Sequence, residues 1–358
     1  MISIDKMKDK VLSNQRLSRE DGIRLFHSYD LLALGRMASQ AAWSKNGDRA
    51  YFVQNMHINP TNVCVNRCKF CAFSRSRGEN GAYEMSIEDI LARARSAGTG
   101  VRELHIVSGL HPDLPFSWYL DMLRSLRKEC PQLHLKAFTA VEIDYLAKLS
   151  GLGLRETLLA LRDAGLGSLP GGGAEIFNPA VRNALCAEKI SGARWLEVME
   201  IAHGIGLKSN ATMLYGHIES IEDRVDHLLR LRELQDRTHG FQAFIPLSFH
   251  SQNTEIKKSA YTTGFDDLKT LAVSRLMLDN FDHIKAYWVM LGEKITQVSL
   301  SFGVDDIDGT VVEERITRMA GGTTEGIMTR DDLVTLIKQA GKVPVERDTV
   351  YNTVRTWE

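Results

Sequence analysis

The feature that most constrains the fold is an alternation of short β-rich runs with amphipathic helical stretches, which begins near residue 51. This alternation is typical of βα units, in which each helix leads the chain to the next strand of a parallel sheet. Eight strands of this kind favour a (β/α)8 TIM-type barrel, with an open doubly wound sheet as the alternative. The expected strands are 56–61, 103–109, 134–139, a short run ending near 168, 209–216, 241–249, 283–291 and 297–303.

Helical patterns flank the alternating region on both sides. Ser18 begins a capping box ahead of a stretch whose apolar spacing is near 3.6 residues, and Thr329 begins another after the last expected strand. We therefore expect N- and C-terminal helical extensions around the barrel. The expected parts are a helical extension at 1–50, a barrel at 51–309, and a helical segment at 310–358 that packs on the barrel.

Charge and composition argue against several classes of protein. The formal net charge of the 358 residues is −1, so no basic field indicates a nucleic-acid or membrane-surface binder. The N-terminus lacks the apolar segment of a secretory signal, and no apolar run reaches the roughly 20 residues that a transmembrane helix needs. The chain has five cysteines without the density of a disulfide scaffold. A reducing compartment fits this usage, and we expect the cytoplasm.

Three of the cysteines lie close together in NPTNVCVNRCKFCAFSRS. Cys64, Cys68 and Cys71 have the spacing C-x3-C-x2-C and follow the first expected strand. Thiolates this close can bind one soft metal centre, whereas a structural zinc site requires four ligands. A zinc site completed by Cys130 or Cys186 is one interpretation. Three ligands alone fit a [4Fe–4S] cluster with one open iron, because a catalytic centre keeps an open coordination position.

The segment CVNRCKFC resembles the signature of the radical S-adenosylmethionine superfamily. The resemblance implies a barrel of the radical SAM kind, whose interior shields a reactive intermediate. It also implies that the open iron binds the amino and carboxylate groups of S-adenosylmethionine, and that the reduced cluster splits this molecule into methionine and a 5′-deoxyadenosyl radical. Phe70 would contact the adenine. An electron donor such as flavodoxin or ferredoxin would reduce the cluster.

Three further segments supply expected contacts for S-adenosylmethionine. Ser108 and Gly109 occupy the place of the family's Gly-Gly-Glu-like turn, although the glutamate is absent and the backbone must act instead. By the same resemblance, Glu175 in LPGGGAEIF binds the ribose hydroxyls and Arg194 binds the methionine carboxylate. A simple turn at Ser108 and a solvated Arg194 are the alternatives. The fifth expected strand adds two residues to the wall of the site, Thr212 and Met213.

Longer fragments resemble the aminofutalosine synthase family of the futalosine route to menaquinone. They include IVSGLHPDLP, SLPGGGAEIF, KSNATMLYGH and VPVERDTVYN, and the resemblance spans roughly residues 50–352. It implies 3-[(1-carboxyvinyl)oxy]benzoate as the substrate, to which the radical would add. Rearrangement and loss of a carboxyl group would then give aminodeoxyfutalosine. Some fragments are shared with cyclic dehypoxanthinyl futalosine synthase and with the tyrosine-coupling subunit of F420 chromophore synthesis, which stay as alternatives.

A substrate with two carboxylates needs cations or hydrogen-bond donors in its pocket. Polar residues at or near the ends of the expected strands are the candidates, although for each one taken alone a structural role is the stronger interpretation. We also expect Arg347 and Tyr351 to fold back over the barrel. The candidates for substrate binding are His57, Asn59, Arg75, His217, Gln242, His250 and Asp305.

Overall fold

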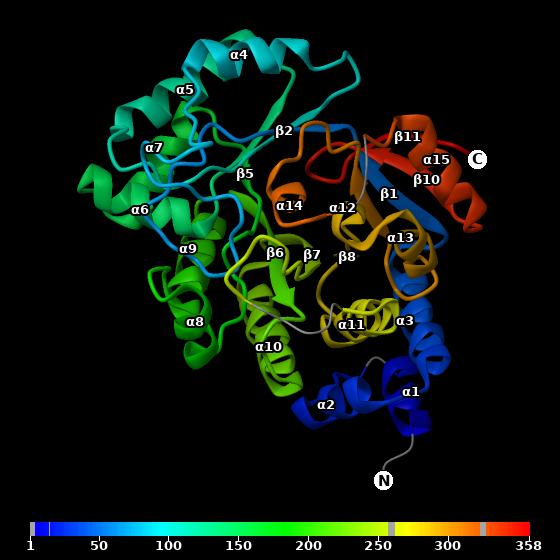
Figure 1. The fold of residues 1–358 in the computed structure, drawn as a ribbon. Coiled ribbons are helices and arrows are strands. Elements are labelled where there is room, and N and C mark those ends of the chain that lie inside the picture. Colours follow the sequence, from blue (N-terminus) through cyan, green and yellow to red (C-terminus); the bar gives the residue numbers. More distant parts are fainter. Residues whose placement is uncertain (1–3, 14, 257–261, 323–326) are drawn as a thin grey trace.

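The computed structural model describes residues 4–13, 15–256, 262–322 and 327–358. Its centre is a parallel sheet of seven strands, which pair in chain order. Helices lie around the outside of these strands (Figure 1). The expected TIM-type architecture is therefore confirmed for this region. The seven strands are β2 (Asn55–Ile58), β3 (Glu103–Ile106), β4 (His134–Ala137), β5 (Ser168–Leu169), β6 (Lys208–Tyr215), β7 (Phe241–Ser248) and β8 (His283–Ile284).

Polar caps fix where several helices begin. Both predicted capping boxes are present, with the Ser18 and Thr329 side chains each accepting a hydrogen bond from a backbone N–H of the first turn. Three helices precede the barrel: α1 (Ile4–Leu12), α2 (Arg19–His27) and α3 (Leu31–Asn46). The helices that follow β2 to β7 are α4 (Ile87–Ser96), α5 (Phe116–Glu129), α6 (Ala140–Ser150), α7 (Leu154–Ala164), α8 (Pro179–Cys186), α9 (Gly192–Gly204), α10 (Ile221–Thr238) and α11 (Gly264–Met277).

The eighth position of the barrel is filled by β9 (Asp306–Gly309) and the residues just after it. Single parallel bridges join Lys285 to Asp306 and Met56 to Val312. This segment therefore lies between the two edge strands of the seven-stranded sheet, β8 and β2.

The expected strand at 297–303 is wrong. Residues 297–299 belong to α13 (Glu293–Ser299). The strand expected at 283–291 is shorter than predicted, because only β8 is a strand there and α12 (Trp288–Leu291) follows it. A short apolar run suits either a helix or a strand, which is why its alternation misled the prediction. Gly292, at a φ of 76°, ends one helix and starts the next, in a conformation that glycine adopts at low cost.

A second sheet joins the two ends of the chain. In it, β1 (Arg49–Val53) pairs in parallel with both β9 and β10 (Val343–Arg347), and β11 (Thr353–Thr356) runs antiparallel to β10. The C-terminal segment is therefore not helical throughout, since α14 (Ile316–Met319) and α15 (Arg330–Gln339) are followed by two strands. Most of β10 is buried, so its sequence lacks the alternation that would have marked it as a strand.

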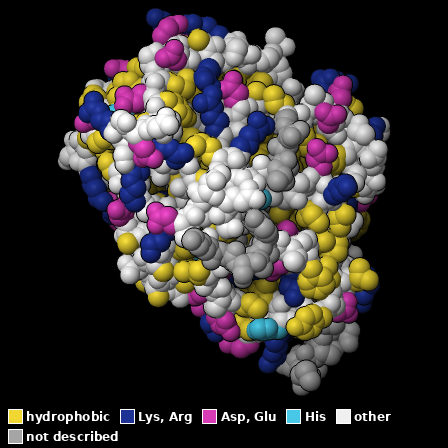
Figure 2. Space-filling model, in the orientation of Figure 1, with side chains coloured by type: hydrophobic (Ala, Val, Ile, Leu, Met, Phe, Trp, Pro, Cys, Tyr) yellow, Lys and Arg dark blue, Asp and Glu magenta, His cyan; other side chains and the backbone are white. Residues whose placement is uncertain are grey.

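Charged side chains of both signs are interspersed over the face shown in Figure 2, in keeping with the net charge of −1. None of the helices that the structure describes has both the length and the apolar composition needed to cross a bilayer.

Candidate functional site

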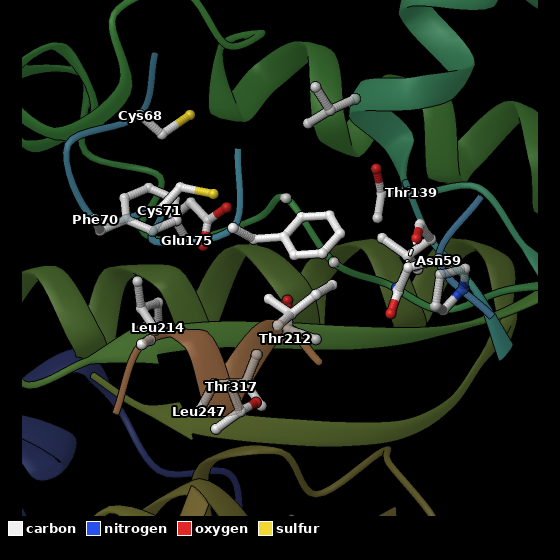
Figure 3. A pocket seen from close by; sticks show the side chains of 18 of the residues that line it. Asn59, Cys68, Phe70, Cys71, Thr139, Glu175, Thr212, Leu214, Leu247 and Thr317 are labelled. Carbon is white, nitrogen blue, oxygen red and sulfur yellow. Dashed lines mark hydrogen bonds between the residues drawn. The ribbon is translucent and has the colours of Figure 1, made fainter. Parts of the chain in front are cut away.

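A large cavity lies among the carboxyl ends of the barrel strands. Its volume is about 330 Å³. The three clustered cysteines, Cys64, Cys68 and Cys71, line it together with Phe70 and Glu175. Figure 3 shows Cys68, Cys71 and Glu175 close together at one end of the cavity. The thiols that the spacing picked out therefore face one space.

Backbone hydrogen bonds hold the cysteine loop in place. The N–H of Cys71 donates to the carbonyl of Cys68 at 2.9 Å, and the N–H of Cys64 donates to the carbonyl of Arg75 at 3.1 Å. Gly109 packs directly on this loop, where a Cβ atom would collide with the carbonyl oxygen of Val63. A glycine is thus needed for the turn after β3 to approach the cysteine loop.

The donor set fits an iron–sulfur cluster. Cys130 and Cys186 do not line the cavity, so they do not complete a four-cysteine zinc site there. In the described ranges, no three His, Cys, Asp or Glu side chains converge closely enough to hold a single metal ion. A cluster makes a smaller demand, because each thiolate binds a different iron. Cys64, Cys68 and Cys71, which all line the cavity, would thus hold three of the irons of a [4Fe–4S] cluster.

Burial controls the protonation of these thiols. It raises the pKa of Cys64 and raises that of Cys68 to about 12. A thiol must lose its proton to bind a metal. The loop is therefore expected to gain its thiolates only together with the metal.

Glu142, which the sequence did not single out, accepts hydrogen bonds from Ser108. Its Oε1 accepts from the Ser108 N–H at 3.0 Å, and its Oε2 accepts from the Thr139 hydroxyl at 2.8 Å. The residue is buried on the cavity wall, and burial raises the pKa of its carboxyl group. A carboxylate thus reaches the turn after β3 from α6, although the local motif lacks one.

Glu175 also lies on the wall, beside a second missed residue. Lys189 places its Nζ atom 2.7 Å from Glu175 Oε1 and 4.9 Å from the centre of the Phe70 ring. Burial alone would raise the pKa of Glu175, but the Lys189 ammonium outweighs it and the pKa lies below its usual range. Glu175 is thus an ionised acceptor within the cavity.

Arg194 does not line the cavity, in contrast to the expectation. Its Nε lies 2.7 Å from Asp144 Oδ1, and its Nη1 lies 2.9 Å from Glu197 Oε2. From the start of α9, the side chain thus contacts Asp144 of the neighbouring α6 and Glu197 of its own helix. Lys189, in the loop before α9, is the cation of this region that faces the cavity.

Of the two residues expected on the wall from strand β6, only one lines the cavity. Thr212 lines the cavity, whereas Met213 is fully buried and does not. Successive side chains of a strand point to opposite faces, so these two neighbours cannot share the barrel interior.

The substrate candidates also divide. His57, Asn59 and His250 line the cavity, and the other four do not. Each of these four is engaged elsewhere by hydrogen bonds or ion pairs. The partners are the carbonyls of Ala72 and Ser74 for Arg75, the carbonyl of Leu214 and the carboxylate of Glu219 for His217, the carbonyl of Thr349 for Gln242, and Arg275 and His283 for Asp305.

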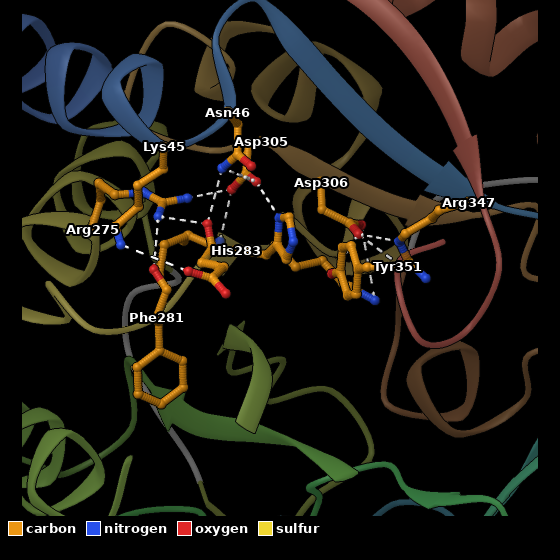
Figure 4. A network of polar contacts seen from close by, with 12 residues as sticks. Lys45, Asn46, Arg275, Phe281, His283, Asp305, Asp306, Arg347 and Tyr351 are labelled. Carbon is orange, nitrogen blue, oxygen red and sulfur yellow. Dashed lines mark hydrogen bonds and ion pairs between the residues drawn. The ribbon is translucent and has the colours of Figure 1, made fainter. Parts of the chain in front are cut away.

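Asp305 belongs to a polar network around β8 and β9 (Figure 4). Its carboxylate pairs with Arg275 and, at 2.5 Å, with His283 Nδ1. The next residue, Asp306, accepts hydrogen bonds from Arg347 and Tyr351, both at 2.7 Å. The C-terminal segment therefore folds back onto the barrel, and these two carboxylates have structural partners.

Polar residues on the inner faces of the strands complete the cavity wall. His105 and Lys136 alternate with the apolar residues of β3 and β4 and line the cavity, which was a usable signal for a site, since ionisable residues are rarely buried without a reason. Glu142 was hidden by its capping-box position, and Lys189 by its place in a loop. The titratable wall residues that the sequence did not single out are His105, Lys136, Glu142, Lys189, Lys285, Tyr287, Asp308 and Glu314.

Two protein families match parts of this chain. Residues 58–231 match the Radical SAM superfamily, and residues 238–358 match the CofH/MqnC C-terminal region. The aminodeoxyfutalosine synthase of Thermus thermophilus is 46% identical, with 98% of this chain and 95% of that protein aligned. That of Streptomyces coelicolor is also 46% identical, over 99% of this chain and 94% of that protein.

Other relatives carry a different name. The 5-amino-6-(D-ribitylamino)uracil–L-tyrosine 4-hydroxyphenyl transferase of Methanoculleus marisnigri is 40% identical over 96% of this chain and 95% of that protein. Among solved structures, the FeFe-hydrogenase maturase HydG from Carboxydothermus hydrogenoformans superposes with a TM-score of 0.73 at 15% identity, covering 97% of this chain and 80% of that one. Methylornithine synthase superposes with a TM-score of 0.70 at 18% identity, covering 94% and 95%. These two likenesses concern the fold.

Proposed function

The chain belongs to the radical S-adenosylmethionine superfamily, and from this premise we propose that it catalyses the aminodeoxyfutalosine synthase reaction. It is an enzyme that uses a [4Fe–4S] cluster and S-adenosylmethionine to form a carbon–carbon bond. The observation that carries the choice of reaction is the 46% identity, over nearly the whole chain, to two proteins of that name.

The residues at the cysteine end have distinct roles in this proposal. Cys64, Cys68 and Cys71 hold the cluster. When bound, the cluster supplies the electron that splits S-adenosylmethionine into methionine and an adenosyl radical. Glu175 accepts hydrogen bonds from the ribose hydroxyls, and Phe70 packs against the adenine. The barrel wall keeps water away from the reacting atoms.

The proposed substrate is 3-[(1-carboxyvinyl)oxy]benzoate. Its double bond receives the adenosyl carbon, the aryl group moves from oxygen to carbon, and the enol carboxyl group leaves as CO2 while one electron returns. Atoms and electrons then balance, with methionine, CO2 and aminodeoxyfutalosine as products. No step of this sequence needs a proton from the protein, so the enzyme's task is to bind, orient and shield. A small reductant protein supplies the first electron.

A second candidate is the tyrosine-coupling transferase reaction named for the archaeal relatives. The 40% identity to the protein of Methanoculleus marisnigri favours it more weakly. The two reactions start from different substrates.

The test is an anaerobic incubation of the reconstituted protein with S-adenosylmethionine, a chemical reductant and the enolpyruvyl benzoate. We expect an adenosine-containing adduct with the mass of aminodeoxyfutalosine. A parallel incubation supplies 5-amino-6-(D-ribitylamino)uracil and tyrosine in place of the benzoate. Turnover there, with no adduct from the benzoate, would instead establish the second candidate.

A further inference from the structure

Three nitrogen-bearing side chains form one layer inside the barrel. His57 on β2, His105 on β3 and Lys136 on β4 lie opposite one another in the strand register. All three line the cavity. The two imidazole rings are stacked, with centroids 4.4 Å apart and planes 5° from parallel.

This layer lies deeper in the barrel than the cofactor residues. Asn59, the first residue after β2, is two positions beyond His57 in the chain, which places the layer roughly 6–7 Å below it. In Figure 3, Asn59 lies at the end of the cavity away from Cys68. A molecule that reacts near the cysteines would therefore present its far end to the layer of His57, His105 and Lys136.

One nitrogen atom of the layer has no partner in the described part of the chain. His57 is 8% exposed, and its Nε2 atom has no hydrogen-bond partner there. Lys136 is 2% exposed and forms a buried ion pair with Glu103, with its Nζ atom 2.7 Å from Oε2. Buried polar groups normally find a partner, so the Nε2 atom of His57 points to a ligand that completes the layer.

An anion is the ligand that fits this layer best. Lys136 is buried, and burial, together with the like charges of Lys285 and Arg347, outweighs Glu103 and lowers its pKa. An incoming carboxylate would compensate that burial with charge-assisted hydrogen bonds. On the facing wall, Lys285 is likewise paired with a carboxylate, that of Asp308 at 2.8 Å, and a further carboxyl group, Glu314, keeps one oxygen without a described partner. That wall repels an anion, which directs it to the side of β2 to β4.

We propose that His57, His105 and Lys136 form the subsite for the ring carboxylate of the aromatic substrate. This inference rests on the proposed function, in which the enol end of the substrate reacts beside the cysteines. The enol carboxylate is attached to the reacting carbon pair and stays at that end. The ring carboxylate is at the opposite end of the molecule. It therefore reaches the part of the cavity that is lined by His57, His105 and Lys136.

The experiment measures binding rather than turnover. Isothermal titration under anaerobic conditions compares two ligands on the holoenzyme: the enolpyruvyl benzoate, and 2-phenoxyprop-2-enoate, which lacks only the ring carboxylate. The wild type should bind the first at least about tenfold more tightly, since hydrogen bonds to charged groups contribute about 1.5–3 kcal/mol.

The informative variant is the double substitution Lys136→Met with Glu103→Gln. It removes the ammonium without leaving a buried carboxylate unpaired, and it keeps the local net charge unchanged. In this variant the two ligands should bind within about threefold of each other, because the benzoate has lost its partner. His105→Phe, which keeps the ring stack, should reduce the difference in the same direction. Lys208→Met is the matched control, since Lys208 is an exposed strand lysine that does not line the cavity.

The outcomes distinguish a wrong subsite from a wrong function. If the wild type binds and converts the benzoate, but both the double variant and His105→Phe keep the full preference for it, the subsite is wrong and the function stands. If the wild type neither binds nor converts the benzoate, the proposed function fails and the subsite with it. A double variant that does not fold leaves His105→Phe to decide.

Discussion

Lys189 places its ammonium nitrogen 2.7 Å from Oε1 of Glu175, on the same cavity wall as the cysteines. This contact brings together a loop before α9 and the glycine-rich turn after β5. Lys189 is therefore the cation at the cysteine end of the cavity, in the place where Arg194 was expected.

Substituting Lys189 should therefore weaken the binding of S-adenosylmethionine. We expect Lys189→Met to raise the dissociation constant of S-adenosylmethionine about tenfold, because the methionine carboxylate loses a charged partner in a buried place. The iron content of the protein should not change. Arg194→Met is the matched control, and equilibrium dialysis with labelled S-adenosylmethionine is the measurement. A loss of affinity in Arg194→Met alone would show that the arginine, not the lysine, binds the cofactor.

Each cysteine of the loop should be required for the cluster. Cys64→Ala, Cys68→Ala or Cys71→Ala should each abolish most of the iron and acid-labile sulfide, which reach about four atoms each per wild-type chain with one cubane cluster. Cys130→Ala and Cys186→Ala should keep full loading, because neither thiol lines the cavity. Stoichiometric zinc in the wild type, with no sulfide, is the opposite result.

A side chain at Gly109 should disturb the cysteine loop. In Gly109→Ala the new methyl group meets the carbonyl of Val63, and overpacking of this kind costs about 1–3 kcal/mol. We expect a lower midpoint of thermal unfolding and a lower yield of cluster on reconstitution. Gly98→Ala is the control, since no atom lies within 4 Å of its added Cβ. Equal midpoints for the two variants would argue against the close contact.

The sequence predicted the parts of the site that depend on local spacing. The cysteine loop and the two capping boxes are short-range patterns, so their residues could be read directly. Lys189 and Glu142 could not, because their roles depend on which loops meet across the barrel. Thr212 and Met213 show a third case: strand alternation separates neighbours, but only the register decides which of them faces inward. Strand β10 was missed because burial on both faces removes the period of its sequence.

The stability of the fold should depend on the ionisation of Asp267. Burial raises the pKa of this carboxyl group to about 6, and its Oδ1 accepts a hydrogen bond from the Tyr215 hydroxyl at 2.7 Å. A raised pKa means that the folded state binds the proton more tightly. The contribution to stability is then complete below about pH 4 and is lost as the pH rises through about 6.

Asp267→Asn should remove this dependence. Between pH 4 and pH 7 the free energy of unfolding of the wild type should fall relative to that of the variant, by on the order of 2–3 kcal/mol. Other titrating groups cancel in the difference. Urea unfolding of both proteins at the two pH values gives the number, and parallel pH profiles would contradict the assignment.

The central claim is that the adenosyl carbon of S-adenosylmethionine becomes part of the product. Its most direct test follows the 5′ carbon, using S-adenosylmethionine labelled there with carbon-13 and turnover with the enolpyruvyl benzoate. The account predicts that the label appears in aminodeoxyfutalosine, bonded to a carbon from the enolpyruvyl group. Recovery of the label in free 5′-deoxyadenosine, with none in an adduct, would contradict it.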